Sequence, residues 1–541
     1  MKKGALIAIL LMCTGILNIA SLNAQDKSNK GKEFWLGYGY SWVFDAEGPP
    51  FNTQELVLYL STDAPANVTV SVTNTSWSQT VAIPANTVDA TIRIPKTGIG
   101  DARIFNEGLH NKAVHIVSDT AIVVYAHTYN TMVSAATMLM PVETYGYKYF
   151  SLNYSQSQSA SSPPNPPVGT TQNGPAWYSY FYVVASEDNT RLEITPSDTT
   201  RNGWLPNNTY TVNLNKGEIY NVMGKLSAGS QAWQASKDLS GSKVVAIPGT
   251  DGNCHPFAFF SGSSGIRLCK SDGGEVMQQQ VFSIQAWGTR YLTYHTLNNT
   301  TTDINAPFKN FYRIAVEDPT TVVTRNGVPM TGLINNFYYE VIDSAGGDYY
   351  ESDKPILLCQ YTPNYNSCWR PPPSLGGTYG DPEMFYLSPI EQGKKDVLFY
   401  VNRNASIDYN YLNVILPTAG LSSLLLDGAP FIPANTKPHP NHPGYSVAVA
   451  RIPGAAAQHR LTCDLTFNAT VYGLGYYESY GYNVGTNINN LNSYTRINNI
   501  FNTTTPVDSF TCPKTPFRLY AKLAYPANSI HWKLSQVPGL S

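Results

Sequence analysis

The sequence predicts an all-β protein built of several tandem or fused antiparallel β-sandwich-like modules, and two observations support this. The first is a repeat: ASEDNTRLEITPSDTTRNG, residues 185–203, recurs in shortened form as AVEDPTTVVTRNG, residues 315–327. Both copies place Asn-Gly after a β-branched run, which is the strongest short-range hairpin signal. The second is composition. Only 13% of the residues are charged, against roughly 25% in an average soluble protein, and the 541 residues include 37 Tyr, 41 Gly and 37 Pro.

The repeat extends along the chain. LVLYLSTDAPANVTVSV at 56–72 and NVILPTAGLSSLLLDGAPF at 413–431 also have the form of a strand, a turn and a second strand. Other segments place four or five apolar residues after a polar turn, which is typical of strands buried on both faces. They begin near Ser118, Ser240 and Ser352. We therefore expect about four degenerate β-units within one domain, residues 25–485.

The repeated turns are predicted to be scaffold. A type I′ turn needs positive φ at both central residues, which Asn-Gly tolerates. The alternative is that Glu187-Asp188 and Glu317-Asp318 are paired carboxylates that bind calcium where modules meet. Calcium takes about six to eight oxygen ligands, and each pair supplies only two carboxylates. A solvated turn is therefore favoured, and no metal site or cofactor is predicted.

The N-terminus has the features of a secretory signal peptide. Lys2 and Lys3 precede an apolar run, and the small residue Ala24 ends the leader. We expect residues 1–24 to be removed and the protein to be secreted or displayed at the cell surface. A spanning helix is the alternative, but the run is short, and no later segment is apolar for long enough to span a membrane. Cys13 lacks the small preceding residues of a lipoprotein cysteine.

Removal of the leader leaves six cysteines, an even number that predicts disulfides in an exported chain. They are Cys254, Cys269, Cys359, Cys368, Cys463 and Cys512. Closeness in sequence favours Cys254–Cys269 and Cys359–Cys368, which leaves Cys463 and Cys512 as the least constrained pair. A disulfide that closes a loop of about 15 residues contributes roughly 3 kcal/mol on the chain-entropy model. Zinc is the alternative near Cys254 and His255, but the spacing fits no standard finger.

Charge and motifs exclude several function classes. The formal net charge is −2 and no basic cluster occurs, so nucleic acid is not an expected partner. SGSSG at 261–265 lies inside the expected Cys254–Cys269 loop and not at a strand-to-helix elbow. HPNH at 439–442 offers two imidazoles, but the neighbouring prolines deny them a helix face and no third ligand is evident. The sequence predicts no enzyme and no catalytic residue, and an extracellular hydrolase is the least favoured function.

Two long proline-rich inserts are the predicted recognition elements: SSPPNPPVGTTQNGPAW at 161–177 and CWRPPPSLGGTYGDP at 368–382. Long loops on a rigid β-scaffold commonly carry binding residues. Large, stiff side chains such as Tyr and Trp suit protein or glycan contacts. The residues expected to contribute to a partner surface are Trp177, Trp369, Arg370 and Tyr379. The alternative is that the prolines only make stiff connectors.

A series of motifs in fixed order links the chain to a known family. The series runs GKEFWLGY at 31–38, QQ at 279–280, WGTRY at 287–291, GDPEMFYLSPIEQ at 380–392 and VYGLGYYESYGYNVG at 471–485. Together they resemble the N-terminal domain of the IgGFc-binding protein family, found in mucus-associated animal proteins and in secreted proteins of Bacteroidota. The segment QQQVFSIQAWG lacks the Pro expected before its Trp-Gly, and no antibody-contact residue can be carried over. The resemblance implies an extracellular binding module whose partner is a protein or a glycan.

The C-terminal tail is predicted to be a linker followed by another domain. Residues 486–506 are rich in Asn and Thr, a composition with little capacity to form a core. Residues 507–541 resemble the start of an Ig-like or polycystic-kidney-disease-like domain, which needs about seven strands and is expected to be truncated here. The alternative is that these residues pack onto the preceding module.

These observations predict a secreted or cell-surface binding or adhesion module for a glycoprotein, a mucin glycan or a host protein such as immunoglobulin. The alternative is a structural stalk or assembly element of a larger extracellular protein, with no ligand of its own. The ligand itself is not named by any motif.

Overall fold

The structure is a computed structural model, and its described part is nearly all strand. The predicted leader, residues 1–24, lies outside the described residues. The described ranges are 27–44, 53–130, 133–154, 177–226, 236–266, 268, 275–297, 309–363, 380–402, 407–431, 435–453, 457–475, 478–492, 494–499 and 517–522. Helices within these ranges are short 3-10 turns, and none is long and apolar enough to cross a membrane. The predicted all-β class is confirmed.

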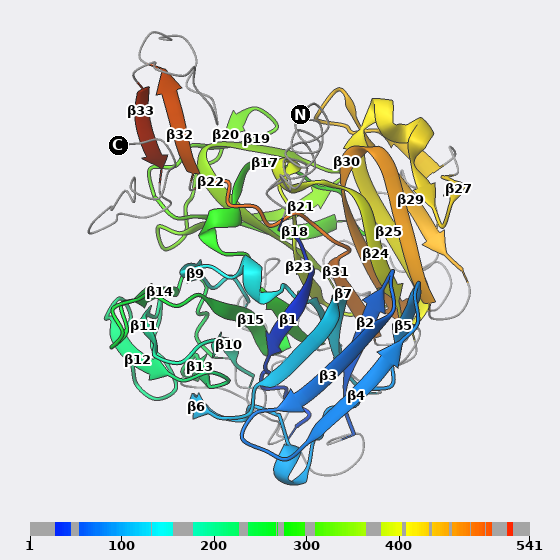
Figure 1. The fold of residues 1–541 in the computed structure, drawn as a ribbon. Helices are drawn as coiled ribbons and strands as arrows, with labels where there is room; N and C mark the ends of the chain where they lie inside the picture. The colour runs from blue at the N-terminus through cyan, green and yellow to red at the C-terminus, as the bar shows by residue number, and fades with distance from the viewer. Residues whose placement is uncertain are drawn as a thin grey trace, which may run out of the picture.

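Four β-units of the same connectivity make up the body of the protein (Figure 1). Unit 1 contains β1 (Lys30–Leu36), β2 (Glu55–Thr62), β3 (Ala66–Val72), β4 (Ser78–Ile83), β5 (Thr87–Asp89), β6 (Gly108–His110), β7 (Val114–Tyr129) and β8 (Ser134–Met138). Unit 2 contains β9 (Lys148–Phe150), β10 (Ser179–Ala185), β11 (Thr190–Thr195), β12 (Tyr210–Leu214), β13 (Ile219–Met223), β14 (Lys243–Ile247), β15 (Phe257–Ile266) and β16 (Glu275–Gln280).

The second half of the chain repeats the pattern. Unit 3 contains β17 (Gly288–Leu292), β18 (Lys309–Val316), β19 (Val323–Arg325), β20 (Val328–Pro329), β21 (Tyr338–Ala345), β22 (Tyr349–Thr362) and β23 (Glu383–Tyr386). Unit 4 contains β24 (Lys394–Val401), β25 (Ile407–Pro417), β26 (Leu425–Leu426), β27 (Ala429–Pro430), β28 (Thr436–Pro438), β29 (Tyr445–Ile452), β30 (Ala457–Gly475) and β31 (Glu478–Asn483). The 3-10 turns are η1 (Gly98–Gly100), η2 (Val142–Thr144), η3 (Ile284–Ala286), η4 (Ile390–Gln392) and η5 (Thr418–Ser423).

A long strand organises units 1, 3 and 4. The first half of β7, β22 or β30 pairs with the first and third strands of its unit, and the second half pairs with the second and last strands. Unit 2 divides this role between β14, which pairs with β9 and β11, and β15, which pairs with β10 and β16. Residues 248–256, between β14 and β15, form no strand, so the counterpart of the long strand is divided in two in unit 2.

The three strands that were expected to be buried on both faces differ in their burial. The stretch 122–126 of β7 and the stretch 356–362 of β22 are buried throughout, as predicted. In β14, burial alternates along the strand, so the prediction is wrong for that strand. Alternation of this kind is typical of an antiparallel sheet that packs on one face only. An apolar run alone does not distinguish the two cases.

The last strands of the units form a closed ring. β8 contacts β16 and β31, and β23 contacts the same two strands. Gln279 of β16 lies at the centre of the ring. Its Nε2 donates to the carbonyl oxygens of Ala136 at 2.7 Å, Met384 at 2.8 Å and Gly481 at 3.1 Å, one in each of the other three strands. One side-chain amide therefore joins all four units, and we call this centre the axis. In Figure 1 the units follow one another from blue to orange, and unit 4 returns to lie beside unit 1.

Successive units meet where a glycine near the start of one unit faces the turn that begins the next unit. A Cβ on Gly31 would lie 2.3 Å from the Cβ of Pro141, and a Cβ on Gly288 would lie 2.3 Å from the Cβ of Pro389. These prolines immediately precede η2 and η4. Only glycine permits backbone and turn to approach this closely.

The predicted type I′ turn occurs in the second copy of the repeat. Asn326 and Gly327, between β19 and β20, have φ values of 54° and 80°. Asp427 and Gly428 in unit 4 have φ values of 53° and 78° and form the same turn. The prediction is confirmed at these two hairpins.

The first copy of the repeat folds differently. Of Asn202 and Gly203, only Gly203 has positive φ, at 91°. Its N–H donates to the carbonyl of Thr200 at 3.0 Å, which closes a type I turn followed by a left-handed glycine. The expected type I′ turn is wrong here because a tertiary contact intervenes: the N–H of Asn202 donates to the Glu107 carboxylate at 3.0 Å.

The body extends beyond the boundary predicted at residue 485. Ile488 is buried in the main hydrophobic core, and its N–H donates to the carbonyl of Lys27 at 2.6 Å. Asn492 donates through Nδ2 to the carbonyl of Trp287 at 2.8 Å. Farther along, β32 (Tyr494–Asn499) pairs antiparallel with β33 (Phe517–Lys522). The range predicted as a linker therefore begins with a packed segment and then contains a strand, because Ile488 and the Asn side chains find partners that composition does not reveal.

Candidate functional site

Strand register gathers two sets of chain connections at one end of the body. The second strand of each unit begins opposite the end of the long strand, or of β15 in unit 2, and the last strand begins there as well. The connections that lead into these strands therefore belong to this end, which we call the loop end. The strands that follow the two proline-rich inserts, β10 after 161–177 and β23 after 368–382, begin at this end; residues 161–176 and 368–379 themselves lie outside the described residues.

Trp177, one of the predicted partner residues, is buried. Its side chain is 1% exposed, its ring centroid lies 5.9 Å from that of Trp42, and a Cβ on Gly265 would lie 2.4 Å from its ring. Trp42 belongs to unit 1 and Gly265 to unit 2, so Trp177 fills the seam between the units. This placement corrects the expectation for Trp177, since the ring has no free area for a partner. The other three predicted residues, Trp369, Arg370 and Tyr379, lie outside the described residues.

The cysteines that the structure describes are free thiols: Cys254, Cys359 and Cys463. Cys254 is exposed, whereas Cys359 and Cys463 are buried. Burial raises the pKa of the Cys359 thiol well above its ordinary value. The predicted disulfide partners, Cys269, Cys368 and Cys512, lie outside the described residues. The three pairings stay predictions.

The Glu-Asp turns, the predicted calcium alternative, form ion pairs with neighbouring side chains. Glu187 lies 2.8 Å from Nδ1 of His255, whose Nε2 lies 2.9 Å from Asp251. Asp318 lies 2.6 Å from Nζ of Lys354, and the hydrogen bond from Lys354 is the main cause that lowers the pKa of Asp318 to about 2. Among the described residues, no three His, Cys, Asp or Glu side chains are assembled as the ligands of a metal ion.

The two histidines of HPNH serve different contacts at the seam between units 3 and 4. His439 is buried and its Nε2 donates to the carbonyl of Thr293 at 3.1 Å. Burial lowers the pKa of His439 to about 4. The ring of His442 lies edge-on to Tyr349, at 4.6 Å between centroids, and to Tyr445, at 4.8 Å. The segment therefore fastens two units together.

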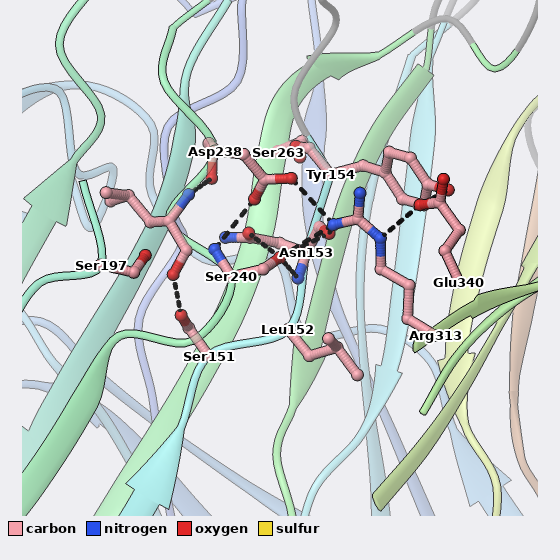
Figure 2. Close-up of polar contacts among 12 residues, drawn as sticks. Ser151, Leu152, Asn153, Tyr154, Ser197, Asp238, Ser240, Ser263, Arg313 and Glu340 are labelled. Carbon is pink, nitrogen blue, oxygen red and sulfur yellow. Dashed lines mark hydrogen bonds and ion pairs between the residues drawn. The ribbon is translucent and has the colours of Figure 1, made fainter. Parts of the chain in front are cut away.

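A buried ionic network joins units 2 and 3 close to the loop end (Figure 2). Arg313 of β18 has Nη1 2.8 Å from Asp238 and Nε 2.9 Å from Glu340. Its guanidinium lies 3.5 Å from the ring centroid of Tyr154, and the Tyr154 hydroxyl donates to Glu340 at 2.5 Å. Tyr154 is the last described residue before the insert that leads into β10. The network therefore fixes one anchor of that insert.

Acidic residues from three units meet where the ring of last strands reaches the loop end. Glu275, Asp381 and Glu478 occupy equivalent positions in their units. In each unit, the backbone N–H six residues later donates to a carbonyl of β15, β22 or β30, respectively. Unit 1 has Val133 there, and Glu383 lies two residues beyond Asp381. We call Glu275, Asp381, Glu383 and Glu478 the axial acids, and none is more than 2% exposed.

The axial acids act on one another electrostatically. Burial, followed by the charges of Glu478 and Asp381, raises the pKa of Glu275 well above its ordinary value. Burial also raises the pKa of Glu383 and of Glu478. Sequence reasoning missed this cluster, because the shared spacing becomes visible only after the four units are aligned through their last strands.

Comparison with known families identifies the family. A family model described as IgGFc binding protein matches residues 135–473, which is more than half of the chain. The chain belongs to the IgGFc binding protein family. The resemblance seen in the motifs is confirmed, and membership indicates an extracellular binding-type module. No curated protein matches the chain.

The matched range in this family member begins inside β8 and ends inside β30. It includes β16 and β23, and with them Glu275, Asp381 and Glu383. The four-unit body is larger than the match, because unit 1 and β31 complete the ring around Gln279.

Proposed function

We propose that this IgGFc binding family member is a secreted or cell-surface module that binds an extracellular glycoprotein, a mucin glycan or a host protein such as immunoglobulin through its loop end. One observation carries the proposal: a rigid four-unit body gathers the connections into its second and last strands at a single end. Binding residues commonly lie on long loops held by a rigid scaffold.

The insert at 368–382 is the proposed centre of the binding surface. Trp369, Arg370 and Tyr379 are residue types that dominate the energy of protein interfaces. The strands on either side of the insert are firmly held, since Thr362 at the end of β22 accepts the N–H of Glu383 at the start of β23 through its hydroxyl at 3.0 Å. A rigid base lowers the entropy that a loop loses on binding.

Export supports the same proposal. The leader at 1–24 would deliver the protein to the extracellular side, where a mucin, a glycoprotein or an antibody is accessible. In that compartment, Cys269, Cys368 and Cys512 would complete the disulfides with Cys254, Cys359 and Cys463.

The test is a glycan and glycoprotein array, with immunoglobulin included, probed with the purified full chain and with Trp369→Ala. We expect saturable binding to a specific member of the array and its loss in the variant. Trp204→Ala is the matched control: Trp204 is half-buried in unit 2, where it stacks between Tyr210 and Tyr220. If folded protein binds nothing on the array, the structural stalk is the better account.

A further inference from the structure

His255 of unit 2 lies between two carboxylates, and each nitrogen of its ring faces one of them. Nδ1 lies 2.8 Å from Oε2 of Glu187, and Nε2 lies 2.9 Å from Oδ2 of Asp251. Ionised carboxylates only accept hydrogen bonds, and a neutral imidazole has a single N–H to donate. Both contacts are therefore hydrogen bonds only when the ring carries its second proton. The geometry specifies an imidazolium at this position.

These contacts join the two connections by which the chain crosses between the sheets of unit 2. Glu187 lies between β10 and β11, and His255 lies in residues 248–256, between β14 and β15. β10 and β15 belong to one sheet, and β11 and β14 belong to the other. Ala185 at the end of β10 pairs with Phe257 at the start of β15. Both connections therefore lie at the end of unit 2 opposite the loop end.

The connection between β14 and β15 lies largely on the surface. Among residues 248–256, all of which the structure describes, only His255 is buried. A second contact with the facing turn is a neutral one, from the Thr250 hydroxyl to Oδ1 of Asn189 at 2.9 Å. Hydrogen bonds between charged groups are roughly twice as strong as neutral ones. His255 is therefore the charged anchor of this connection.

Unit 3 has the corresponding contact with a different partner. Its Glu-Asp turn follows β18, and Asp318 pairs with Nζ of Lys354 at 2.6 Å. Lys354 belongs to β22, the continuous strand that takes the place of β14 and β15. A lysine keeps its charge over the pH range in which a histidine titrates. The contact is therefore permanent in unit 3, whereas in unit 2, where the strand is interrupted, it depends on a titratable ring.

The groups around His255 favour its charged form. Burial lowers its pKa, but the hydrogen bonds and charges of Glu187 and Asp251 outweigh burial, so the pKa lies above 6.5. Two other ionisable groups lie here, Cys254 and Tyr147. Burial, followed by the charge of Asp251, raises the pKa of the Cys254 thiol. Burial, followed by the charges of Glu187 and Cys254, raises the pKa of Tyr147, so neither group adds a charge near neutral pH.

We propose that His255 is a pH-dependent clamp: its imidazolium fastens residues 248–256 to the Glu187 turn, and loss of its proton releases that segment. The neutral ring keeps one donor, so one of its two carboxylate contacts is lost. The folded state binds this proton more tightly than the unfolded chain does. The stabilisation is therefore complete below pH of about 6.5 and is lost as the pH rises through the higher folded-state pKa. The clamp goes beyond the proposed binding function and does not depend on it.

The test is hydrogen exchange of the full chain, followed by mass spectrometry at about pH 6 and about pH 9 and corrected for intrinsic exchange rates. We expect the protection of residues 248–256 to fall by about threefold to tenfold at the higher pH, while that of β22 stays constant. His255→Gln should show the lower protection at both pH values. His255→Lys, which supplies the permanent charge found in unit 3, should keep the higher protection at both.

Titration of the histidine rings by NMR gives a second readout, with the His255 signal assigned by its absence in His255→Gln. We expect its midpoint to lie above 6.5. Glu187→Gln should lower this midpoint, whereas Glu351→Gln, at an exposed position in β22, should leave it unchanged. A wild-type midpoint at or below 6.5 would overturn the proposal. Equal protection of residues 248–256 at both pH values in the wild type would overturn it as well.

Discussion

Arg313 of unit 3 and Asp238 of unit 2 form an ion pair of 2.8 Å in which the two side chains are only 1% and 6% exposed (Figure 2). Removal of one member of a buried pair leaves the other charge uncompensated. Arg313→Met leaves both Asp238 and Glu340 without this partner, so we expect it to lower the free energy of unfolding by about 3–5 kcal/mol in urea titrations. Arg290→Met is the control, because its pair with Glu391 is exposed and should cost less than about 1 kcal/mol. Equal losses would contradict the account.

Gln279→Leu tests the centre of the ring. The variant keeps an apolar side chain of similar length but removes the amide that donates to three other strands. Three buried carbonyls then lose a donor, and we expect a loss of about 1–3 kcal/mol in the free energy of unfolding, measured by chemical denaturation. Gln79→Leu, in the outer strand β4, should change it by less than about 0.5 kcal/mol. A Gln279 variant as stable as the control would show that the axis does not join the units.

The two Thr-Arg-Asn-Gly turns should respond differently to the same substitution. Asn326 has φ of 54°, donates to Asp348 at 2.7 Å and accepts the N–H of Tyr349 at 2.8 Å. Asn326→Ala should therefore cost about 1–3 kcal/mol, since alanine disfavours positive φ and both hydrogen bonds are lost. Asn202→Ala, without positive φ and at an exposed position, should cost less than about 0.5 kcal/mol. Thermal unfolding of the two variants measures this difference. A larger loss of stability in Asn202→Ala than in Asn326→Ala would refute the turn assignment.

Low pH should weaken the contact that His439 makes between units 3 and 4. Burial is the main cause that lowers the pKa of His439 from 6.5 to about 4; the carbonyl of Thr293 and Asp348 oppose the shift, while Lys437 and His442 reinforce it. Because the folded state binds this proton less readily than the unfolded chain, the stabilisation is complete above pH of about 6.5 and is lost as the pH falls towards 4.

The measurement for this seam is the free energy of unfolding at a series of pH values between 7 and about 4. His439→Gln has no proton to take up, so its stability should fall less steeply with acid than that of the wild type. Parallel curves for the two proteins would exclude His439 as a source of acid sensitivity.

Sequence reasoning predicts the strands and hairpins because their causes are local. Asn326-Gly327 specifies a type I′ turn by φ preference alone. The identical pair Asn202-Gly203 does not form that turn, because the Glu107 carboxylate, distant in sequence, binds the Asn202 N–H. Local chemistry thus determines a turn only where no tertiary contact competes.

The candidate sites depend on such tertiary contacts. Trp177 is buried because it packs against Trp42 and Gly265, which lie in different units. Similarly, Glu275 and Glu478 are far apart in the chain and become neighbours only when the ring closes. The recurrence of an acidic residue at one position of the last strands was present in the sequence, yet it acquires meaning only once the strands are aligned.

The most direct test of the central claim is a binding isotherm of the full chain for the glycoprotein or glycan that the array identifies, repeated with Trp369→Ala and Trp204→Ala. If the loop end is the binding face, Trp369→Ala weakens binding by about tenfold or more, equivalent to about 1.4 kcal/mol, while Trp204→Ala binds as the wild type does. Unchanged binding by Trp369→Ala together with loss in Trp204→Ala would place the face on unit 2 and contradict the claim.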